Sequence, residues 1–255
     1  MPHHLPAVPE DSAPRGDRAG RAGSAQGGLG LPGRIEAVRE AIASACARAG
    51  RRPQDVRLIA ATKSVPADVV LEAREAGIED FGENYAAELA TKAALVGARW
   101  HFLGRLQRGT AARVAEVADV VHSAEPGHGL ERLARSAARA GRTIDCMAQV
   151  DFTGLRQGVE PEPAVLAGFI DRAGQLEGIR MVGLMTLPPV TPSAEAARPY
   201  FVRLRELRDR LGTTLPGLVE LSMGMSFDYP VAVEEGATMV RVGRALFGER
   251  PDARG

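Results

Sequence analysis

Lysine is scarce in this chain, and the position of one lysine indicates chemistry. The sequence has 255 residues and 32 basic side chains, but only Lys63 and Lys92 are lysines. Lys63 follows the apolar run 58–61, LIAA, which is typical of a buried strand. Burial at a strand end lowers the pKa of an amine and makes it a better nucleophile toward an aldehyde. A lysine whose ammonium group extends to water is the alternative, and this pattern alone leaves both open.

A second group of residues, near the carboxyl terminus, is suited to a phosphate. Segment 222–226 is SMGMS and segment 241–244 is RVGR, each at the end of an apolar run. Free backbone N–H groups at the last two strands of an α/β barrel often hold a phosphate. Gly243 equally fits a bulge or a tight packing position. An amine nucleophile combined with a phosphate cradle would suit an aldehyde that carries a phosphate, and pyridoxal 5'-phosphate (PLP) is such a molecule.

The elements that must position these residues alternate regularly between apolar runs and amphipathic segments. A first helix is expected from Arg34, with Ile35, Val38, Ile42 and Cys46 at helical spacing. Strands are then expected at 56–63, 80–84, 99–104, 119–124, 143–152, 180–187, 217–224 and within 238–248, with a helix after each of the first seven. Eight parallel βα-type units predict an α/β fold: a single-domain TIM (β/α)8-type barrel with an additional N-terminal helix. A doubly wound sheet is the runner-up, but it would usually show a glycine-rich loop after the first strand.

Composition sets the expected boundaries and excludes several classes of function. Residues 1–33 are rich in Pro, Gly, Ala and Arg, so we expect a disordered tail, then a barrel over 34–250 and a short tail at 251–255. A formal net charge of +0 argues against a nucleic-acid binder. No apolar stretch is long enough to span a membrane. The two cysteines, Cys46 and Cys146, are expected to be reduced core thiols, which suits a cytoplasmic protein. No metal-ligand spacing appears, so no metal is expected.

Several segments together resemble the pyridoxal phosphate homeostasis protein family. They are LIAATKSVPADVV, FGENYAAEL, WHFLGRLQ, VHSAE, GLMTLPP and LSMGMSFDYPVAVEEGATMVRVGRALFG, in that order over about residues 34–250. The family is similar to the N-terminal barrel of alanine racemase, known as fold type III of PLP proteins. The resemblance implies that Lys63 holds PLP as an internal aldimine.

The resemblance also implies a set of cofactor-binding positions. Arg241 matches the arginine that faces the pyridine nitrogen in alanine racemase-like barrels, and Ser222 matches a phosphate contact. The full implied set is Lys63, Asn84, His101, Met185, Ser222, Met223, Arg241, Gly243 and Arg244. Two positions depart from the family pattern. Arg244 stands where the family usually has Thr or Ser, and Gly109 stands where an asparagine is usual.

The sequence favours a cofactor carrier over an enzyme. An arginine at the pyridine nitrogen cannot accept a proton, so the ring is a poorer electron sink. Racemisation needs a second base, which alanine racemase-like enzymes take from an additional domain that this chain is not expected to have. We therefore expect a non-catalytic protein of intracellular PLP homeostasis, monomeric, with PLP-dependent apoenzymes as candidate partners. The alternative is a minor amino-acid racemase or lyase with Tyr85 as the base. A third hypothesis is a degenerate barrel that acts through protein contacts alone.

Overall fold

The computed structural model describes residues 28–154 and 157–248, and these form a closed parallel barrel. The strands follow one another around the barrel in chain order, and β1 pairs with β8 to close it. The strands are β1 (Arg57–Ala61), β2 (Asp80–Glu83), β3 (Arg99–Phe102), β4 (Val120–Ala124), β5 (Ile144–Val150), β6 (Ile179–Thr186), β7 (Glu220–Met225) and β8 (Met239–Val242). The predicted (β/α)8-type barrel is therefore confirmed.

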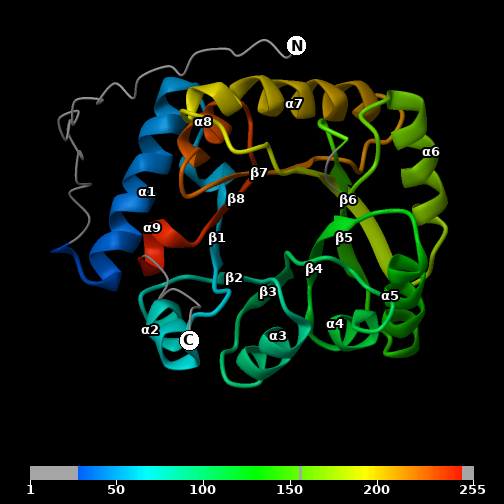
Figure 1. Ribbon diagram of the computed structural model, residues 1–255, viewed down its shortest axis with the longest axis horizontal. Helices are drawn as coiled ribbons and strands as arrows, with labels where there is room; N and C mark the ends of the chain where they lie inside the picture. The colour runs from blue at the N-terminus through cyan, green and yellow to red at the C-terminus, as the bar shows by residue number, and fades with distance from the viewer. Residues whose placement is uncertain (1–27, 155–156, 249–255) are drawn as a thin grey trace, which may run out of the picture.

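A ring of helices surrounds the strands (Figure 1). The helices are α1 (Leu31–Arg48), α2 (Ala67–Glu75), α3 (Ala86–Ala93), α4 (Ala111–Val117), α5 (His128–Arg139), α6 (Pro163–Gly174), α7 (Arg198–Gly212), α8 (Tyr229–Glu234) and α9 (Arg244–Phe247). Two apolar clusters result because both faces of each strand are covered. The barrel interior holds Ile59, Val120, Met147, Met185 and Met239. The larger cluster fills the layer between strands and helices.

The additional N-terminal helix, α1, packs beside the last βα unit (Figure 1). Its buried face carries Ile35, Val38 and Ile42, as the helical spacing predicts. Arg51, just after α1, donates hydrogen bonds to the carbonyl oxygens of Val233 and Ala237. Helix α1 thus holds the carboxyl-terminal elements of the barrel against its amino-terminal elements.

The structure corrects one expected boundary. Helix α1 begins at Leu31, so residues 31–33 are helical and the tail expected over 1–33 ends earlier. Pro32 lies in the first turn of the helix, where its missing N–H group has no intrahelical partner to lose. The remainder of that tail, up to residue 27, and the tail expected at 251–255 lie outside the described residues.

A bulge in β7 shapes the end of the barrel that carries the phosphate-type segment. Ser222 pairs with Met239 and Met225 with Arg241, so one extra residue lies on the β7 side. Gly224 has φ +91°, and a Cβ atom there would lie 2.6 Å from the Cβ of Ala232. Glycine is therefore required at this position, because it alone tolerates both the backbone conformation and the close approach of α8.

Candidate functional site

A cavity of about 310 Å³ opens at the carboxyl ends of the strands. Ligand pockets of this size occur at this face in TIM barrels. Six predicted residues line it: Lys63, Asn84, Met185, Arg241, Gly243 and Arg244. Residues that we did not predict complete the lining: Ala61, Leu103, His122, Leu187, Met225, Ser226 and Phe227. The structure thus brings the amine of the first strand and the glycine of the last strand to one cavity.

Lys63 lies in a tight turn that directs its side chain over the cavity. The turn follows β1 and is closed by the N–H of Val65, which donates to the carbonyl oxygen of Thr62 at 2.8 Å. Ser64 has φ +60°, the left-handed conformation that disfavours side chains. Its N–H donates to Oε2 of Glu88 at 2.9 Å, which stabilises this conformation. The Nζ atom of Lys63 lies 5.1 Å from the centroid of the Tyr85 ring, a cation–π contact.

The other lysine is used structurally. Lys92 is buried and its Nζ atom donates to three oxygens: the carbonyl of Thr62 at 2.8 Å, Oε1 of Glu83 at 2.5 Å and Oε2 of Glu88 at 2.8 Å. All three donor positions of the ammonium group are therefore occupied. Lys63, whose side chain is only partly buried, is the lysine that can react with an aldehyde in the cavity.

Arg241 forms the floor of the cavity and is held rigidly. Its guanidinium donates to Oγ of Ser222 and, at 2.9 Å, to the carbonyl oxygen of Thr186. Burial lowers the pKa of Arg241 to about 10, partly countered by the carboxylate of Asp228. The side chain remains charged near neutral pH. Ser222 itself is fully buried beneath the cavity and does not line it, so any contact it makes with a cofactor there would be indirect.

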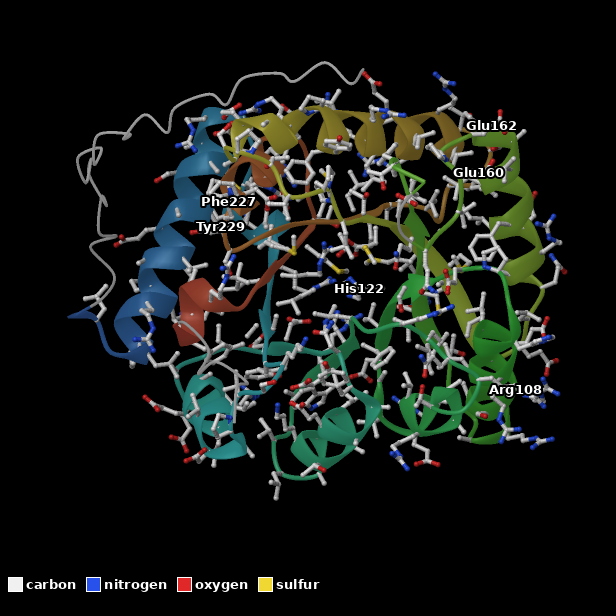
Figure 2. All side chains as sticks on the ribbon, viewed as in Figure 1. Arg108, His122, Glu160, Glu162, Phe227 and Tyr229 are labelled. Atoms are coloured by element: carbon white, nitrogen blue, oxygen red, sulfur yellow. The ribbon has the colours of Figure 1, made fainter. Side chains whose placement is uncertain are left out.

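The expectation that His101 lines the pocket is wrong, and His122 takes that place. In the barrel, His101 of β3 lies level with Val120 of β4. His122 is therefore two residues nearer the carboxyl end of the barrel, among the side chains inside the ring of strands (Figure 2). The available signal for His122 was the strand segment DVVHSA (119–124), in which two valines are followed by a histidine and a serine. Burial lowers the pKa of both histidines, and for His122 the nearby His101 and Arg241 lower it further.

Met223 also lies away from the cavity. It is fully buried among the residues that pack between the strands and helices. Ser222 and Met223 are adjacent on β7, and successive side chains of a strand point to opposite faces. Because Ser222 faces the barrel interior, Met223 faces the helices.

Two backbone amides converge on one oxygen beside Arg244. The N–H of Gly243 and the N–H of Ala245 donate to Oγ of Ser226 at 3.1 Å and 3.3 Å. An anionic oxygen that displaced the Ser226 hydroxyl would find the same two donors. The exposed Arg244 side chain lies at the same edge of the cavity.

The charged side chains that line the cavity all carry a positive charge. Its described lining contains three cationic side chains, Lys63, Arg241 and Arg244, and no carboxylate. Asp228, whose pKa is raised by burial, accepts a hydrogen bond from the N–H of Met225 and is not part of the lining. In a chain whose formal net charge is +0, such a local excess favours a multiply charged anion. No group of residues that could hold a metal ion is found in the described ranges.

Comparisons with known proteins agree with this geometry. Residues 34–251 match the family model described as "Alanine racemase, N-terminal domain". The pyridoxal phosphate homeostasis protein of Aquifex aeolicus is 38% identical over 223 residues, covering 85% of this chain and 97% of that protein. The corresponding protein of Deinococcus radiodurans is 39% identical over 218 residues, covering 84% and 99%. This chain belongs to the pyridoxal phosphate homeostasis protein family.

Solved structures extend the comparison. PipY of Synechococcus elongatus, solved with PLP bound, matches with a TM-score of 0.75 and 35% identity over 86% of this chain and 100% of PipY. Alanine racemase of Clostridium difficile matches with a TM-score of 0.65 and 15% identity, covering 84% of this chain and 60% of that chain, a likeness of fold alone. The family thus shares its barrel with a racemase. No described helix is long and apolar enough to cross a membrane.

Proposed function

We propose that this protein binds pyridoxal 5'-phosphate in the cavity, with its aldehyde on Nζ of Lys63 and its phosphate beside Gly243 and Arg244. The observation that carries the proposal is the positively charged cavity, which holds a free amine at one edge and two convergent backbone amides at another. Membership of the family and the PLP bound to PipY support it. PLP supplies an aldehyde that condenses with an amine, with the loss of water.

The proposed roles of the other lining residues follow from their chemistry. Arg241 would face the ring nitrogen, and because it cannot accept a proton it would leave that nitrogen unprotonated. Asn84, Met185 and His122 would form the walls around the ring. His101, Ser222 and Met223, which the family resemblance also implied, do not line the cavity, so any effect they have on the cofactor would be indirect.

Absorbance spectroscopy tests the binding. We expect the purified or PLP-loaded protein to show the absorbance of the covalently held cofactor, and borohydride reduction to fix it on the peptide that contains Lys63. Lys63→Ala is expected to lose that absorbance, whereas Tyr85→Phe retains it because no covalent role is assigned to Tyr85. Unchanged absorbance in Lys63→Ala would reject the assignment. A wild-type protein that cannot be loaded would favour the degenerate barrel.

We infer further that the protein holds the cofactor without turning over substrate, in the cytoplasm, as a monomer that supplies PLP-dependent apoenzymes. The two free, buried cysteines suit a reducing compartment. The competing function is a minor racemase or lyase, and one observation favours it: Nζ of Lys63 lies over the Tyr85 ring. However, the Tyr85 side chain is 51% exposed, which is unfavourable for a base that must be screened from water.

Exchange of the α-proton separates these two functions. The loaded protein is incubated with amino acids in deuterated water, with alanine racemase as the positive control. We expect no incorporation above the rate given by free PLP. Exchange that Tyr85→Phe abolishes would replace the carrier hypothesis with the enzyme hypothesis. Light scattering after size-exclusion chromatography tests the monomer.

A further inference from the structure

An unbroken line of hydrogen bonds crosses the barrel interior. Oδ1 of Asp80 lies 2.8 Å from Nε2 of His101, and Nδ1 of His101 lies 2.8 Å from Nε2 of His122. Nδ1 of His122 lies 2.7 Å from Oγ of Ser222, which also accepts a hydrogen bond from Arg241. The line starts at the first residue of β2, at the amino-terminal end of the barrel, and ends in the cavity floor.

A single arrangement of protons satisfies this line when Asp80 is ionised and both imidazoles are neutral. A carboxylate only accepts, so Nε2 of His101 carries a proton and its Nδ1 accepts from Nε2 of His122. Nδ1 of His122 then accepts the hydroxyl proton of Ser222, whose oxygen is left to accept from Arg241. Every hydrogen bond points in the same direction, from Arg241 toward Asp80, and both imidazoles are neutral.

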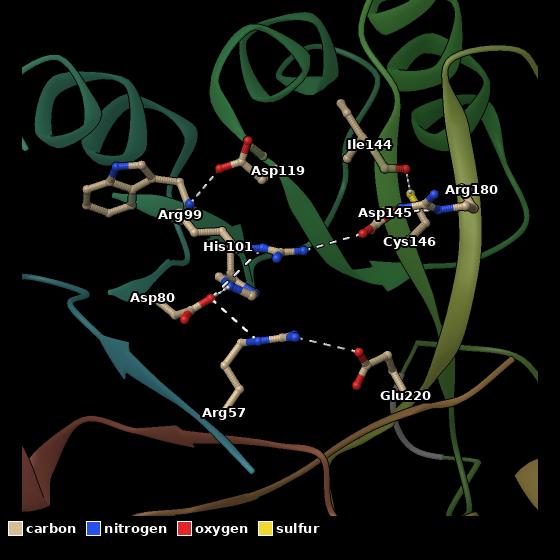
Figure 3. A network of polar contacts seen from close by, with 12 residues as sticks. Arg57, Asp80, Arg99, His101, Asp119, Ile144, Asp145, Cys146, Arg180 and Glu220 are labelled. Carbon is tan, nitrogen blue, oxygen red and sulfur yellow. Dashed lines mark hydrogen bonds and ion pairs between the residues drawn. The ribbon is translucent and has the colours of Figure 1, made fainter. Parts of the chain in front are cut away.

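The surroundings favour that arrangement. Asp80 lies near two guanidinium groups, those of Arg57 at 3.9 Å and Arg99 at 4.0 Å, so cationic side chains flank this end of the line (Figure 3). These arginines also face Glu220 at 3.7 Å and Asp145 at 3.4 Å. Both histidines are fully buried, where a charged imidazole would be costly, and their pKa values are accordingly lowered.

We propose that Asp80, His101 and His122 are positioning residues that fix Arg241 through the hydroxyl of Ser222. If the proton of His122 moved to Nδ1, His122 and Arg241 would both donate to Oγ of Ser222, and the hydroxyl proton would need another acceptor. A carboxylate at one end of the barrel therefore sets the hydrogen bonding of the arginine at the other end. This proposal concerns the protein without its cofactor. Only the expected effect on the absorbance of bound PLP rests on the proposed function.

Nitrogen NMR of the cofactor-free, full-length protein tests the line directly. Long-range ¹H–¹⁵N correlation distinguishes the two neutral tautomers and the imidazolium form. We expect His101 and His122 to be neutral and protonated on Nε2, with exposed His128 as an internal reference. Protonation of His122 on Nδ1, or an imidazolium at either position near neutral pH, would overturn the proposal whether or not PLP binds.

Two matched variants test the long-range effect. Asp80→Asn replaces a pure acceptor by a group that also donates, and we expect it to shift the ring nitrogens of both His101 and His122 and the guanidinium signals of Arg241. In the PLP-loaded protein it is expected to shift the absorbance maximum. Asp145→Asn alters the same surface network without contacting a histidine, and we expect it to leave these signals unchanged.

Ser222→Ala removes the other end of the line and covers the case in which Asp80→Asn does not fold. It is expected to shift the Arg241 signals while His101 keeps its Nε2 proton. Arg241 signals that do not move in the folded variant would overturn the proposal. Loss of PLP uptake with wild-type tautomers would instead count against the proposed function.

Discussion

The two ends of the barrel differ in how their charged side chains are arranged. At the amino-terminal end, charged residues in the first two positions of the strands alternate in sign: Arg57 and Arg99 flank Asp80, and Arg99 and Arg180 flank Asp145 (Figure 3). At the carboxyl-terminal end, the cavity holds three cations with no carboxylate in its described lining. Charges at the first end are paired within the chain, whereas the cations in the described cavity lining have no carboxylate beside them in that lining.

This difference distinguishes charged side chains that stabilise the fold from those that are suited to binding a ligand. Desolvating an unpaired cation costs free energy, as the lowered pKa of Arg241 indicates. Proteins commonly retain such a loss of stability at a site where the charge contributes to ligand binding. Behind the cavity, by contrast, the cation of Lys92 is buried with two carboxylates. The comparison therefore predicts that substituting the paired cation Lys92 lowers stability, whereas substituting a cation of the cavity lining chiefly affects ligand binding.

The largest effect is expected from the two lysines. Lys92→Met leaves the buried carboxylate of Glu83 without its cation, and breaking such a pair typically costs about 3–5 kcal/mol of unfolding free energy. Lys63→Met removes a cation–π contact with an exposed ring but no hydrogen bond or ion pair to a described residue, and it is expected to change stability by about 1 kcal/mol or less. Urea denaturation measures both. Equal losses of unfolding free energy in the two variants would contradict the comparison.

A smaller effect is expected from Arg244. Arg244→Ala removes one charge from the cavity edge, and we expect PLP to bind about tenfold more weakly, or about 1.4 kcal/mol, in equilibrium titrations. The salt dependence of binding should also become shallower. Arg180→Ala, at the opposite end of the barrel, is the control and should leave the affinity unchanged. An equal loss in the control would mean that overall charge, not the cavity, attracts the ligand.

The smallest effect concerns pH. Burial acts to raise the pKa of Glu88, but hydrogen bonds from Lys92 and the N–H of Ser64 outweigh it and hold the pKa below its ordinary value. Its stabilising contribution is therefore present above that ordinary value and is lost as pH falls through the folded-state pKa.

Urea denaturation at several pH values measures this. The stability difference between wild type and Glu88→Gln is expected to shrink below about pH 4. For Glu116→Gln, on the exposed side of α4, we expect little difference at any pH. A wild-type advantage that stays constant in acid would contradict the role given to Glu88.

Much of the fold was predictable because its signals are local. Each strand of the barrel overlaps an expected run, since buried parallel strands are continuous apolar segments. Helix α9 was not predicted, because four residues, Arg244–Phe247, are too few to show helical periodicity. Likewise, the start of α1 was missed by three residues because a Pro-Gly pair resembles the end of a tail.

The sequence by itself determined the barrel and the residues at its carboxyl end, because strand order and strand ends follow from local pattern. Lys63 and Gly243 were found in this way, and the family resemblance added Arg241. Only the tertiary structure decided which neighbouring side chain reaches the cavity. The stagger between β3 and β4 places His122 above His101, and alternation along β7 turns Met223 outward. Register and facing depend on how strands pair across the closed barrel, and no local segment encodes that pairing.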